Sequence, residues 1–458
     1  MRMRIFVRGL KGLRAAALGA ASAVILTATP ASGMDLKEAL STAVNDNPDI
    51  GEAIESRRAT FQELEQARGL YLPQVDLEAN IGPEMRDNRT TRAAGTDNDW
   101  FNRRDLSLTL QQLIWDGGGT DAEYERQAAR VDAASYRVME RTEFVGLDVT
   151  ESYLNVLRQL ELAQIAQENV RFHERMAGDI GRQVRGGVGR ASDDQQARER
   201  LEAARVTSVE IARSLDESRN RFRRLVGVLP DELVVPGTVT EFMPETLDGA
   251  IVMAREGNPS IKSARADLDT ARAEYDAADA RFYPRLSFEM TGRAGEDLDG
   301  DGSGRDNDVR ALLVLRYNIF RGGIDPANLQ EQVHRQGEAA HRLSGSEREV
   351  EELARNAWDG LERARERRAL LEKQVEVSSK VLSSYRAEFT AGNRSLLDIL
   401  DAQNSLVGAQ VDLSTARYAE LFAEYRMLAV AGRLMSTVGV SQPAETTPFR
   451  PATAGSAE

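Results

Sequence analysis

The chain has no cysteine among its 458 residues, and this absence removes several kinds of chemistry. Without cysteine there is no disulfide framework, no thiol nucleophile and no lipid anchor on a cysteine side chain. Aromatic residues are also scarce, at 6% of the chain. Few aromatics beside many Ala, Glu, Arg and Gln residues indicate long helices with thin cores, in place of the two or three globular domains that this length would otherwise favour.

Basic residues are in deficit: 59 Lys and Arg stand against 73 Asp and Glu, a formal charge of −14 at pH 7. Five of the bases lie in the N-terminal segment, namely Arg2, Arg4, Arg8, Lys11 and Arg14. Removing that segment would take the charge from −14 to about −19, since −14 − 5 = −19. Nucleic acid is therefore not expected as a partner, because its phosphates require basic patches.

Long apolar runs are absent after residue 34, so no transmembrane helix is predicted there, because such a helix needs about 20 apolar residues. The apolar run 15–28 follows the N-terminal bases and precedes the small residues 31–33. This order is typical of a secretory signal peptide, and we predict cleavage before Met34. The alternative, a membrane-anchoring helix, would need a longer apolar run.

Catalytic patterns are absent as well. The sequence shows no nucleophile–base pattern and no phosphate-binding loop, so we expect neither an enzyme nor a cofactor. The three histidines, His173, His334 and His341, have no accompanying carboxylate–histidine cluster and are predicted to be surface residues without a metal.

What the chain does have is an internal duplication. Asn47-Pro48 recurs as Asn258-Pro259, at an offset of 211. After a loop that is shorter by six residues, Trp115 matches Phe320 at an offset of 205. Further matches at this offset pair Asp193, Ala197, Leu201 and Gly227 with Asp398, Ala402, Leu406 and Gly432. Each half therefore repeats one unit: helix, strand, loop, strand, very long helix, turn, helix.

The strands alternate with period two. The apolar positions of the first three strands are Val75, Leu77, Ala79, Ile81, Leu106, Leu108, Leu110, Leu286, Phe288 and Met290. The fourth strand, expected around residues 309–320, alternates less cleanly. Segments of about ten residues with one apolar and one polar face are typical of membrane β-barrels. An ordinary half-buried hairpin of a soluble protein gives the same pattern, so the strands alone do not distinguish a membrane barrel from a soluble hairpin.

The long helices are predicted from Gly118 to about Gly186 and from about Asp325 to Ala391. A helix of this length would extend for roughly 100 Å at about 1.5 Å per residue. Apolar residues recur at spacings of three and four, as in Val350, Leu353, Ala357, Leu361 and Ala364, and this spacing marks a coiled-coil seam. A soluble coiled-coil rod would explain the helices, but it leaves the signal peptide and the strands unexplained.

The strand count favours an oligomer. Open sheet edges cannot face lipid, because each unpaired backbone group costs several kcal/mol there. Four strands per chain cannot close a barrel, since about eight is the smallest number seen. If the hairpins lie in a bilayer, several copies must share one barrel, and the polar face with Asp76, Glu78, Asn80 and Glu289 lines a water-filled pore.

Three motifs give the chain a resemblance to the TolC family of outer-membrane efflux proteins over residues 35–435. They are Gly187-Val-Gly189-Arg-Ala-Ser192-Asp193, Gly392-Asn-Arg394-Ser395-Leu-Leu-Asp398-Ile-Leu-Asp401, and Tyr317-Asn318-Ile-Phe320-Arg-Gly322-Gly323. The resemblance implies a fold that is mostly α with membrane β. It implies a homotrimer with a twelve-stranded barrel in the outer-membrane lipid and a twelve-helix periplasmic tunnel. The implied partners are a periplasmic adaptor and an inner-membrane ABC exporter or proton-driven pump.

The resemblance also implies site residues. Asp398 and Asp401 match the aspartates that form acidic rings at the closed periplasmic entrance, and Arg394 and Asp193 match positions that hold neighbouring helices together there. The turns with Gly187, Gly189, Ser192, Gly392 and Ser395 match the tips that dock onto the adaptor. Carboxylate rings attract cations. The plainer alternative is that both aspartates are solvated residues at a helix start. Phe389 replaces a tyrosine of the archetypal member, so no phenolic bond to Asp193 can form.

The segment Asp297-Leu-Asp299-Gly-Asp301-Gly302, with Asp308 at the twelfth position, resembles a calcium-binding loop. It lies between predicted strands, not helices, and ends in Asp instead of Glu. An acidic external loop is the favoured interpretation, with calcium as the alternative.

The predicted organisation is a signal peptide (1–33), a first repeat (34–227), a linker (228–246), a second repeat (247–435) and a disordered tail (436–458). The predicted function is a passive exit duct, with type I protein secretion favoured because of the missing anchor cysteine and the Tyr317–Gly323 motif. Efflux of drugs or other small molecules is the first alternative. A periplasmic coiled-coil adaptor or scaffold is the alternative from another class.

Overall fold

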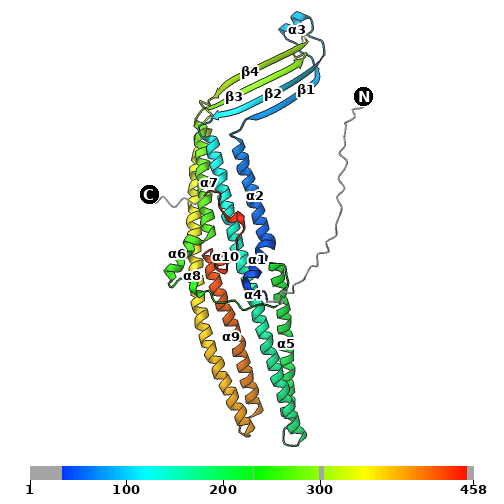
Figure 1. Cartoon of the computed structure of the whole chain (residues 1–458), viewed down its shortest axis with the longest axis vertical. Coiled ribbons are helices and arrows are strands. Elements are labelled where there is room, and N and C mark those ends of the chain that lie inside the picture. The colour runs from blue at the N-terminus through cyan, green and yellow to red at the C-terminus, as the bar shows by residue number, and fades with distance from the viewer. Residues whose placement is uncertain (1–32, 231, 299–303, 451–458) are drawn as a thin grey trace, which may run out of the picture.

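The protein is described from a computed structural model that covers residues 33–230, 232–298 and 304–450. The predicted signal peptide lies almost wholly outside the described residues. A four-stranded sheet forms one end of the molecule, and a long rod of helices forms the rest, as Figure 1 shows. No helix within the described ranges has both the length and the apolar content needed to cross a bilayer.

The two halves repeat the same order of elements. The first half contains α1 (Leu36–Asp46), α2 (Pro48–Gly69), β1 (Gln74–Glu84), the short α3 (Arg89–Ala94), β2 (Phe101–Trp115), α4 (Gly119–Arg185) and α5 (Ala191–Val226). The second contains α6 (Leu247–Gly257), α7 (Pro259–Asp279), β3 (Arg285–Glu296), β4 (Arg305–Arg316), α8 (Ile324–Thr390) and α9 (Leu396–Val430). A short α10 (Leu434–Val438) follows, and the 3-10 turns are η1 (Thr240–Phe242), η2 (Ala280–Phe282) and η3 (Ala444–Thr446).

The repeated Asn-Pro pair performs the same task in each half. Asn47 caps α2 by accepting from the N–H of Asp49 at 2.9 Å, and its amide donates to the carbonyl of Leu225 at 3.0 Å. Asn258 caps α7 in the same way and donates to the carbonyl of Val430 at 2.9 Å. Proline fits the first helical turn because its missing N–H would be unpaired there. Each pair thus starts one helix and fastens the end of the returning helix.

The sheet has the order β1-β2-β3-β4, with all neighbours antiparallel. The register places Val75, Leu110, Met290 and Ala311 side by side across the four strands. Because side chains alternate between faces, the polar residues one position along form a row on the opposite face. One face is therefore apolar and the other polar, as the alternation predicts.

The fourth strand ends earlier than the sequence indicates. We expected it near residues 309–320, but β4 ends at Arg316, where Arg285 is its last partner. Pro284 precedes Arg285, and the chain before it belongs to η2. With no further partner in β3, residues 317–320 leave the ladder, and Gly322 and Gly323, with φ of 64° and 83°, turn the chain into α8.

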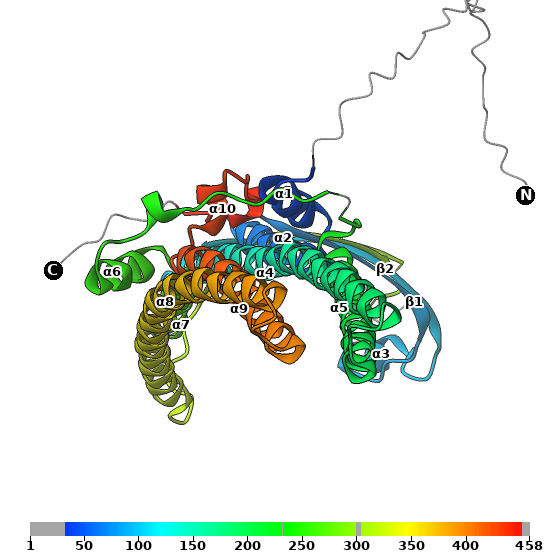
Figure 2. The ribbon, with the colours of Figure 1, turned by 90° about the horizontal axis from the view of Figure 1, so that it is seen from below.

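The helices form a curved layer when the molecule is viewed along its length (Figure 2). α4 lies in the middle of this layer and contacts α2, α5, α7 and α9. The short helices α1, α6 and α10 lie on its convex side (Figure 2). The main apolar core gathers where α1, α4, α5, α9 and α10 meet, around Leu40, Tyr153, Phe222 and Leu428.

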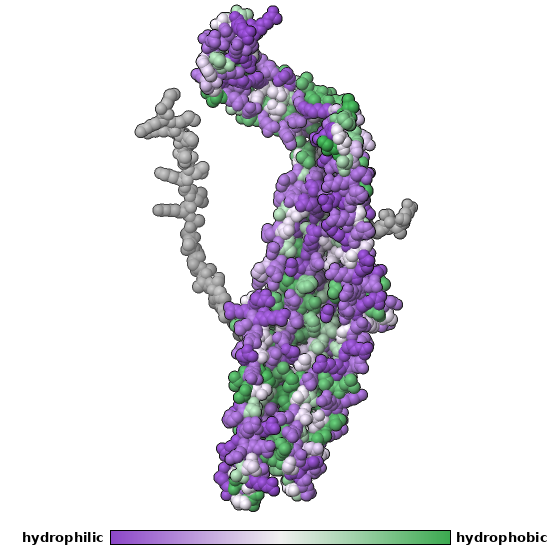
Figure 3. Space-filling model, turned by 180° about the vertical axis from the view of Figure 1, so that it is seen from behind, coloured by the Kyte–Doolittle hydropathy of each residue, from purple (hydrophilic) through white to green (hydrophobic). Residues whose placement is uncertain are grey.

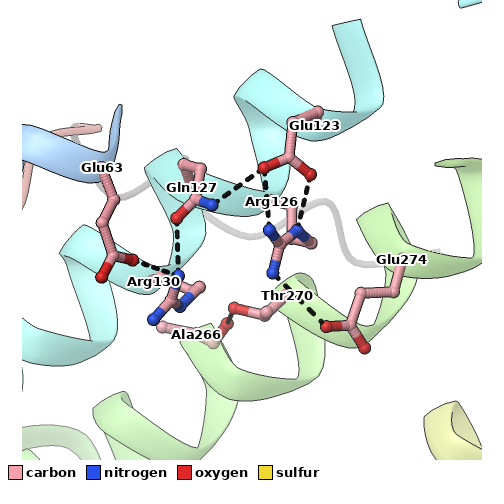
Figure 4. Close-up of polar contacts among 8 residues, drawn as sticks. All are labelled: Glu63, Glu123, Arg126, Gln127, Arg130, Ala266, Thr270 and Glu274. Atoms are coloured by element: carbon pink, nitrogen blue, oxygen red, sulfur yellow. Dashed lines mark hydrogen bonds and ion pairs between the residues drawn. The ribbon is translucent and has the colours of Figure 1, made fainter. Parts of the chain in front are cut away.

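Near the sheet, a polar network joins α2, α4 and α7 (Figure 4). Arg130 of α4 binds Glu63 of α2 and donates to Gln127 at 2.8 Å. Arg126 pairs with Glu123 at 2.8 Å and reaches Glu274 of α7 at 3.8 Å. Leu64 of α2 packs against Ala128 and Val131 of α4 at the same level, so the network adds polar cross-helix contacts to apolar ones.

The predicted disorder of the C-terminal tail is wrong for residues 436–450. Asp132, a buried residue of α4, accepts from the N–H groups of Phe449 and Arg450 at 2.7 and 3.0 Å and pairs with the Arg450 guanidinium at 2.8 Å. Phe449 also packs against Phe61, with ring centroids 6.3 Å apart. The sequence does not reveal these contacts, because they follow no period and the hydrogen-bonded residues lie more than 300 positions apart. Residues 451–458 lie outside the described part.

Candidate functional site: the helical tips

Two helical turns form the end of the rod opposite the sheet (Figure 1). The first joins α4 to α5, and Gly187 within it has φ of 80°. The second joins α8 to α9, and Gly392 has φ of 82°. Left-handed backbone of this kind ends helices and favours glycine. Both turns are therefore set by glycines at equivalent positions of the repeat.

Gly189 has a different requirement from Gly187. A Cβ at Gly189 would lie 3.0 Å from the backbone nitrogen of Val184 and 2.9 Å from its side chain. Nothing lies near the equivalent point of Gly187 or Gly392. The first turn is therefore more tightly folded back on its helix, and it exposes Val188 at its apex.

Ser395 and Asp398 form a capping box at the start of α9. The Asp398 N–H donates to the Ser395 hydroxyl at 3.3 Å, and the Ser395 N–H donates to Asp398 Oδ2 at 3.3 Å. A reciprocal pair of this kind satisfies donors that the first helical turn leaves free. The plainer interpretation of Asp398, a residue that starts a helix, therefore has a direct structural basis.

Arg394 lies within the same turn. Its Nε donates to Glu388 at 2.9 Å, its Nη1 is 3.9 Å from Asp398, and its guanidinium lies 3.9 Å from the ring centre of Tyr385. Asp193, in the other turn, accepts from Ser192 at 3.4 Å. Within the described residues no ion pair joins Arg394 to Asp193, so a single chain does not itself make the link between these two residues.

Asp401 makes a contact between the two hairpins. Its carboxylate lies 3.9 Å from Nη2 of Arg200, which belongs to α5. Two residues further along α9, the Gln403 amide donates to Asn169 of α4 at 3.0 Å. The motifs did not identify Arg200 or Asn169, and no periodic signal marks them, because their partners come from the other half of the chain.

An apolar cluster lies just above the turns and unites all four long helices. Its buried members are Phe172, Ile180, Ala197, Leu382, Leu396, Ile399, Leu400 and Ala402. Phe389 packs against this cluster as a half-buried residue. The side chain that replaces the tyrosine of the archetypal pattern therefore contributes apolar contact.

His173 is buried beside this cluster, so its predicted surface position is wrong. Only 2% of it is exposed, and its ring meets Phe172 edge-on at 5.1 Å. Burial, assisted by the nearby Arg200, lowers the pKa of His173 below its ordinary value. His334 and His341 are exposed, as expected. A helical period does not distinguish a buried histidine from an exposed one when the helix packs on several sides.

The candidate calcium loop is only partly described. Asp299 and Asp301 lie outside the described residues. Asp297 has a left-handed backbone with φ of 57°, and Asp308 pairs with Arg310 at 3.2 Å. The described part of the chain contains no group of three or more acidic or histidine residues that could hold a metal ion.

The model of the family called outer membrane efflux protein matches residues 39–228 and 250–433. The outer membrane efflux protein BepC of Brucella suis is 22% identical over 435 residues, which cover 95% of this chain and 92% of that protein. The outer membrane protein TolC of Escherichia coli is 23% identical, covering 85% of this chain and 80% of that protein. The alkaline protease secretion protein AprF of Pseudomonas aeruginosa is 24% identical, covering 90% and 87%.

A solved structure of CusC, described as undergoing conformational changes during folding and transmembrane channel formation, superposes with a TM-score of 0.75. It is 18% identical in sequence and covers 89% of this chain and 93% of that one. At this identity the likeness bears on the fold, and it agrees with the predicted combination of a small sheet and long helices.

Proposed function

The chain belongs to the outer membrane efflux protein family, that of TolC, and we propose that three copies of it form the passive exit duct of a tripartite export system. As a family member it is a protein of the outer membrane. The proposal assigns the sheet to the membrane and the helical rod to the periplasm. It assigns the energy of transport to an inner-membrane partner, reached through a periplasmic adaptor.

The proposal rests on the unpaired edges and the exposed apolar face of the sheet. Both of its edges, β1 and β4, are unpaired in the described sheet. Its apolar face is open to solvent in the single chain: Leu77, Val309 and Leu313 are 68%, 72% and 69% exposed. An apolar face needs lipid or protein against it, and open edges need further strands. Pairing β4 of one copy with β1 of the next satisfies both requirements, and the polar face then encloses the lumen.

Under this proposal, the helical tips of the three copies form the periplasmic entrance of the duct. Asp398 and Asp401 of three copies would form two rings of carboxylates, which concentrate negative potential where lumenal walls exclude solvent. The Asp401–Arg200 contact and the apolar cluster hold the two hairpins of one chain together. Arg394 and Asp193 would hold neighbouring chains together. Opening then requires separation of these contacts, with an adaptor that binds the open arrangement more tightly.

The adaptor would dock on the exposed turns. Gly187, Gly189 and Gly392 give both turns their shape, and Ser192 and Ser395 begin the returning helices. Val188 in the first turn and Leu397 at the start of α9 are 83% and 42% exposed. Small residues beside exposed apolar ones allow close backbone contact, which suits an interface between helical tips.

For the cargo we favour a secreted protein. The relative named as an alkaline protease secretion protein matches over 90% of this chain, and the chain has no cysteine for a lipid anchor. Small-molecule efflux is the second candidate, supported by the similarity to proteins named for efflux. Export of a reporter protein from cells that contain each type of inner-membrane partner would separate the two.

The test of the proposal is the conductance of the purified protein in planar bilayers. We expect stable single-channel currents with cation preference. Asp398→Asn with Asp401→Asn should reduce that preference and weaken block by multivalent cations. Asp412→Asn, an exposed position three turns further along α9, is the matched control. Currents that are never seen would refute the duct, whereas currents unchanged by the double substitution would refute only the acidic gate.

A further inference from the structure

A cavity of about 850 Å³ opens where the sheet meets the helices. Its wall is built from the end of α7, the start of β3, the start of α4 and the segment between β4 and α8. Four arginines line it: Arg281, Arg285, Arg316 and Arg321. In a chain with a formal charge of −14, such a concentration of guanidinium groups is unexpected.

Two of these arginines lie directly opposite each other. Arg285 and Arg316 are cross-strand partners in the β3–β4 ladder, and like charges in that position destabilise a sheet. Glu289 relieves one of them, since it pairs with Arg316 at 2.7 Å. Asp325 lies 3.3 Å from Arg321. No ion pair joins Arg281 or Arg285 to any carboxylate in the described part of the chain, so their charges are available.

The acidic residues at the cavity are already engaged. Asp116 accepts from the N–H and the hydroxyl of Thr120 at 3.0 and 2.8 Å. Glu123 is held by Arg126 and Gln127, as Figure 4 shows. Arg126 offsets the charge of Glu123, so among the described residues the unpaired Arg281 and Arg285 exceed the one remaining negative charge at the cavity, that of Asp116.

The wall of the cavity is firmly packed on one side. Tyr283, which lines it, meets Trp115 edge-on at 6.2 Å. A Cβ at Gly117 would lie 2.5 Å from the Tyr283 Cβ, so only glycine permits this approach. The equivalent glycine of the second half, Gly322, has nothing within 4 Å. Tyr283 thus lines the cavity beside the arginines, and 48% of it remains exposed.

The cavity lies on the polar side of the sheet. Arg285 and Arg316 occupy the same face as Ser287, Glu289 and Gln111, according to the strand register. Under the proposed function this is the lumenal face, so a solute inside the duct would pass the arginines at the junction of barrel and tunnel.

We infer that this cavity is a binding site for oxyanions, the phosphate or carboxylate groups of solutes in the lumen. Guanidinium groups bind such oxyanions through paired hydrogen bonds, and the free Arg281 and Arg285 supply the donors. Three copies of the site would form a basic belt between the acidic lumen of the barrel and the acidic entrance. The location in the lumen rests on the proposed function, whereas binding by the single chain does not.

The test uses inorganic pyrophosphate as the probe and the channel in bilayers of neutral phosphatidylcholine. Pyrophosphate should reduce the open-channel current, and Arg281→Gln with Arg285→Gln should raise the concentration needed for half block by at least about tenfold. Arg281→Lys with Arg285→Lys should retain most of the block. The matched control is Arg213→Gln with Arg363→Gln, two exposed residues paired only within their own helices, which should leave the block unchanged.

Calorimetric titration of the detergent-purified protein with pyrophosphate provides a second measurement. It should show the same ranking of variants as the current block. If binding is measured but no current is ever observed, the proposed channel function is refuted and the oxyanion site is retained. Equal binding by the parent and the glutamine variant would overturn the inference. Binding only to vesicles with anionic lipid, and not to pyrophosphate, would also overturn it, because the site would then face lipid.

Discussion

The long helix of the first half and its counterpart in the second half have the same length and very different surroundings. Both α4 and α8 contain 67 residues, and an offset of 205 aligns them from end to end. Yet 27 residues of α4 are buried, against six of α8. α4 packs in the middle of the layer, whereas α8 contacts α6, α7 and α9 at its edge. Duplication therefore supplies two equivalent elements, and position in the layer decides which of them finds a core within one chain.

The same comparison explains the C-terminal segment. Asp132 and Glu143 of α4 bind it, but the equivalent residues of α8 are Gly337 and Arg348. Glu143 is buried and accepts from the N–H groups of Leu434 and Met435 at 3.0 and 3.4 Å. Figure 3 shows the rear face of the rod as mostly hydrophilic, with hydrophobic areas between the hydrophilic ones. The apolar residues that α8 leaves exposed, such as Leu370 and Val377, are available for a neighbouring copy.

The largest change in the free energy of unfolding should come from substitutions at Tyr153 of α4 and at Trp358, its aligned counterpart in α8. Tyr153 is fully buried, and its hydroxyl lies 2.6 Å from the carbonyl of Val234 and 2.8 Å from that of Met34, either of which can accept its proton. Tyr153→Ala should lower the free energy of unfolding by about 4 kcal/mol, and Trp358→Ala by about half as much because Trp358 is only half-buried. Denaturant unfolding followed by helical circular dichroism checks this. Equal losses of unfolding free energy in the two variants would contradict the inferred difference in burial between α4 and α8.

The next effect depends on pH. Burial raises the pKa of Glu143 to about 7, although its hydrogen-bond donors oppose the shift. Folding thus favours the protonated carboxyl, and this contribution is complete below the unfolded value of 4.5 and is lost as pH rises to about 7. The loss should be about 3 kcal/mol, since each pKa unit is worth about 1.4 kcal/mol.

Glu143→Gln should remove this part of the pH dependence, which unfolding curves between pH 4.5 and 8 measure as a difference from the parent. The difference matters because His173, with its lowered pKa, contributes with the opposite sign: its stabilisation is lost as pH falls. A parent and a variant with parallel pH profiles would show that Glu143 does not titrate in this range.

A smaller loss is expected at Asp132. Asp132→Asn weakens its bonds to Phe449 and Arg450 and should cost about 2 kcal/mol, the range of hydrogen bonds to charged groups. Chymotrypsin should then cleave faster after Phe449 in the C-terminal segment. Asp267→Asn is the control, because its pair with Arg137 is exposed and such pairs contribute less than about 1 kcal/mol. Cleavage that is equally slow in both variants would indicate that other contacts hold the segment.

The smallest effect on folding should occur at Val377, the α8 counterpart of the buried Phe172. Val377 is 58% exposed, so Val377→Ser should change the free energy of unfolding of a single chain by less than about 0.5 kcal/mol. It should nevertheless reduce the fraction of SDS-resistant trimer on gels, since α8 would pack against a neighbouring copy. An intact trimer fraction would place another surface in that interface.

The sequence by itself determined the repeat, the four strands, the long helices and the two faces of the sheet, because each is encoded by local periodicity or by a constant offset. It also indicated the turns at Gly187 and Gly392, where a left-handed backbone demands glycine. The residues proposed for the gate could be named from the sequence, but their partners could not. Asp398 is bound within its own turn, and Asp401 faces an arginine from the other hairpin.

Only the tertiary structure decided which of the two long helices is buried and where β4 ends. It also decided that His173 is buried and that residues 436–450 pack against α4. Each of these depends on contacts between segments far apart in the chain, and such contacts leave no period in the sequence. β4 ends where its partner β3 has no further residue to pair. Residues 436–450 are ordered because buried carboxylates of α4 accept hydrogen bonds from the N–H groups of the C-terminal segment.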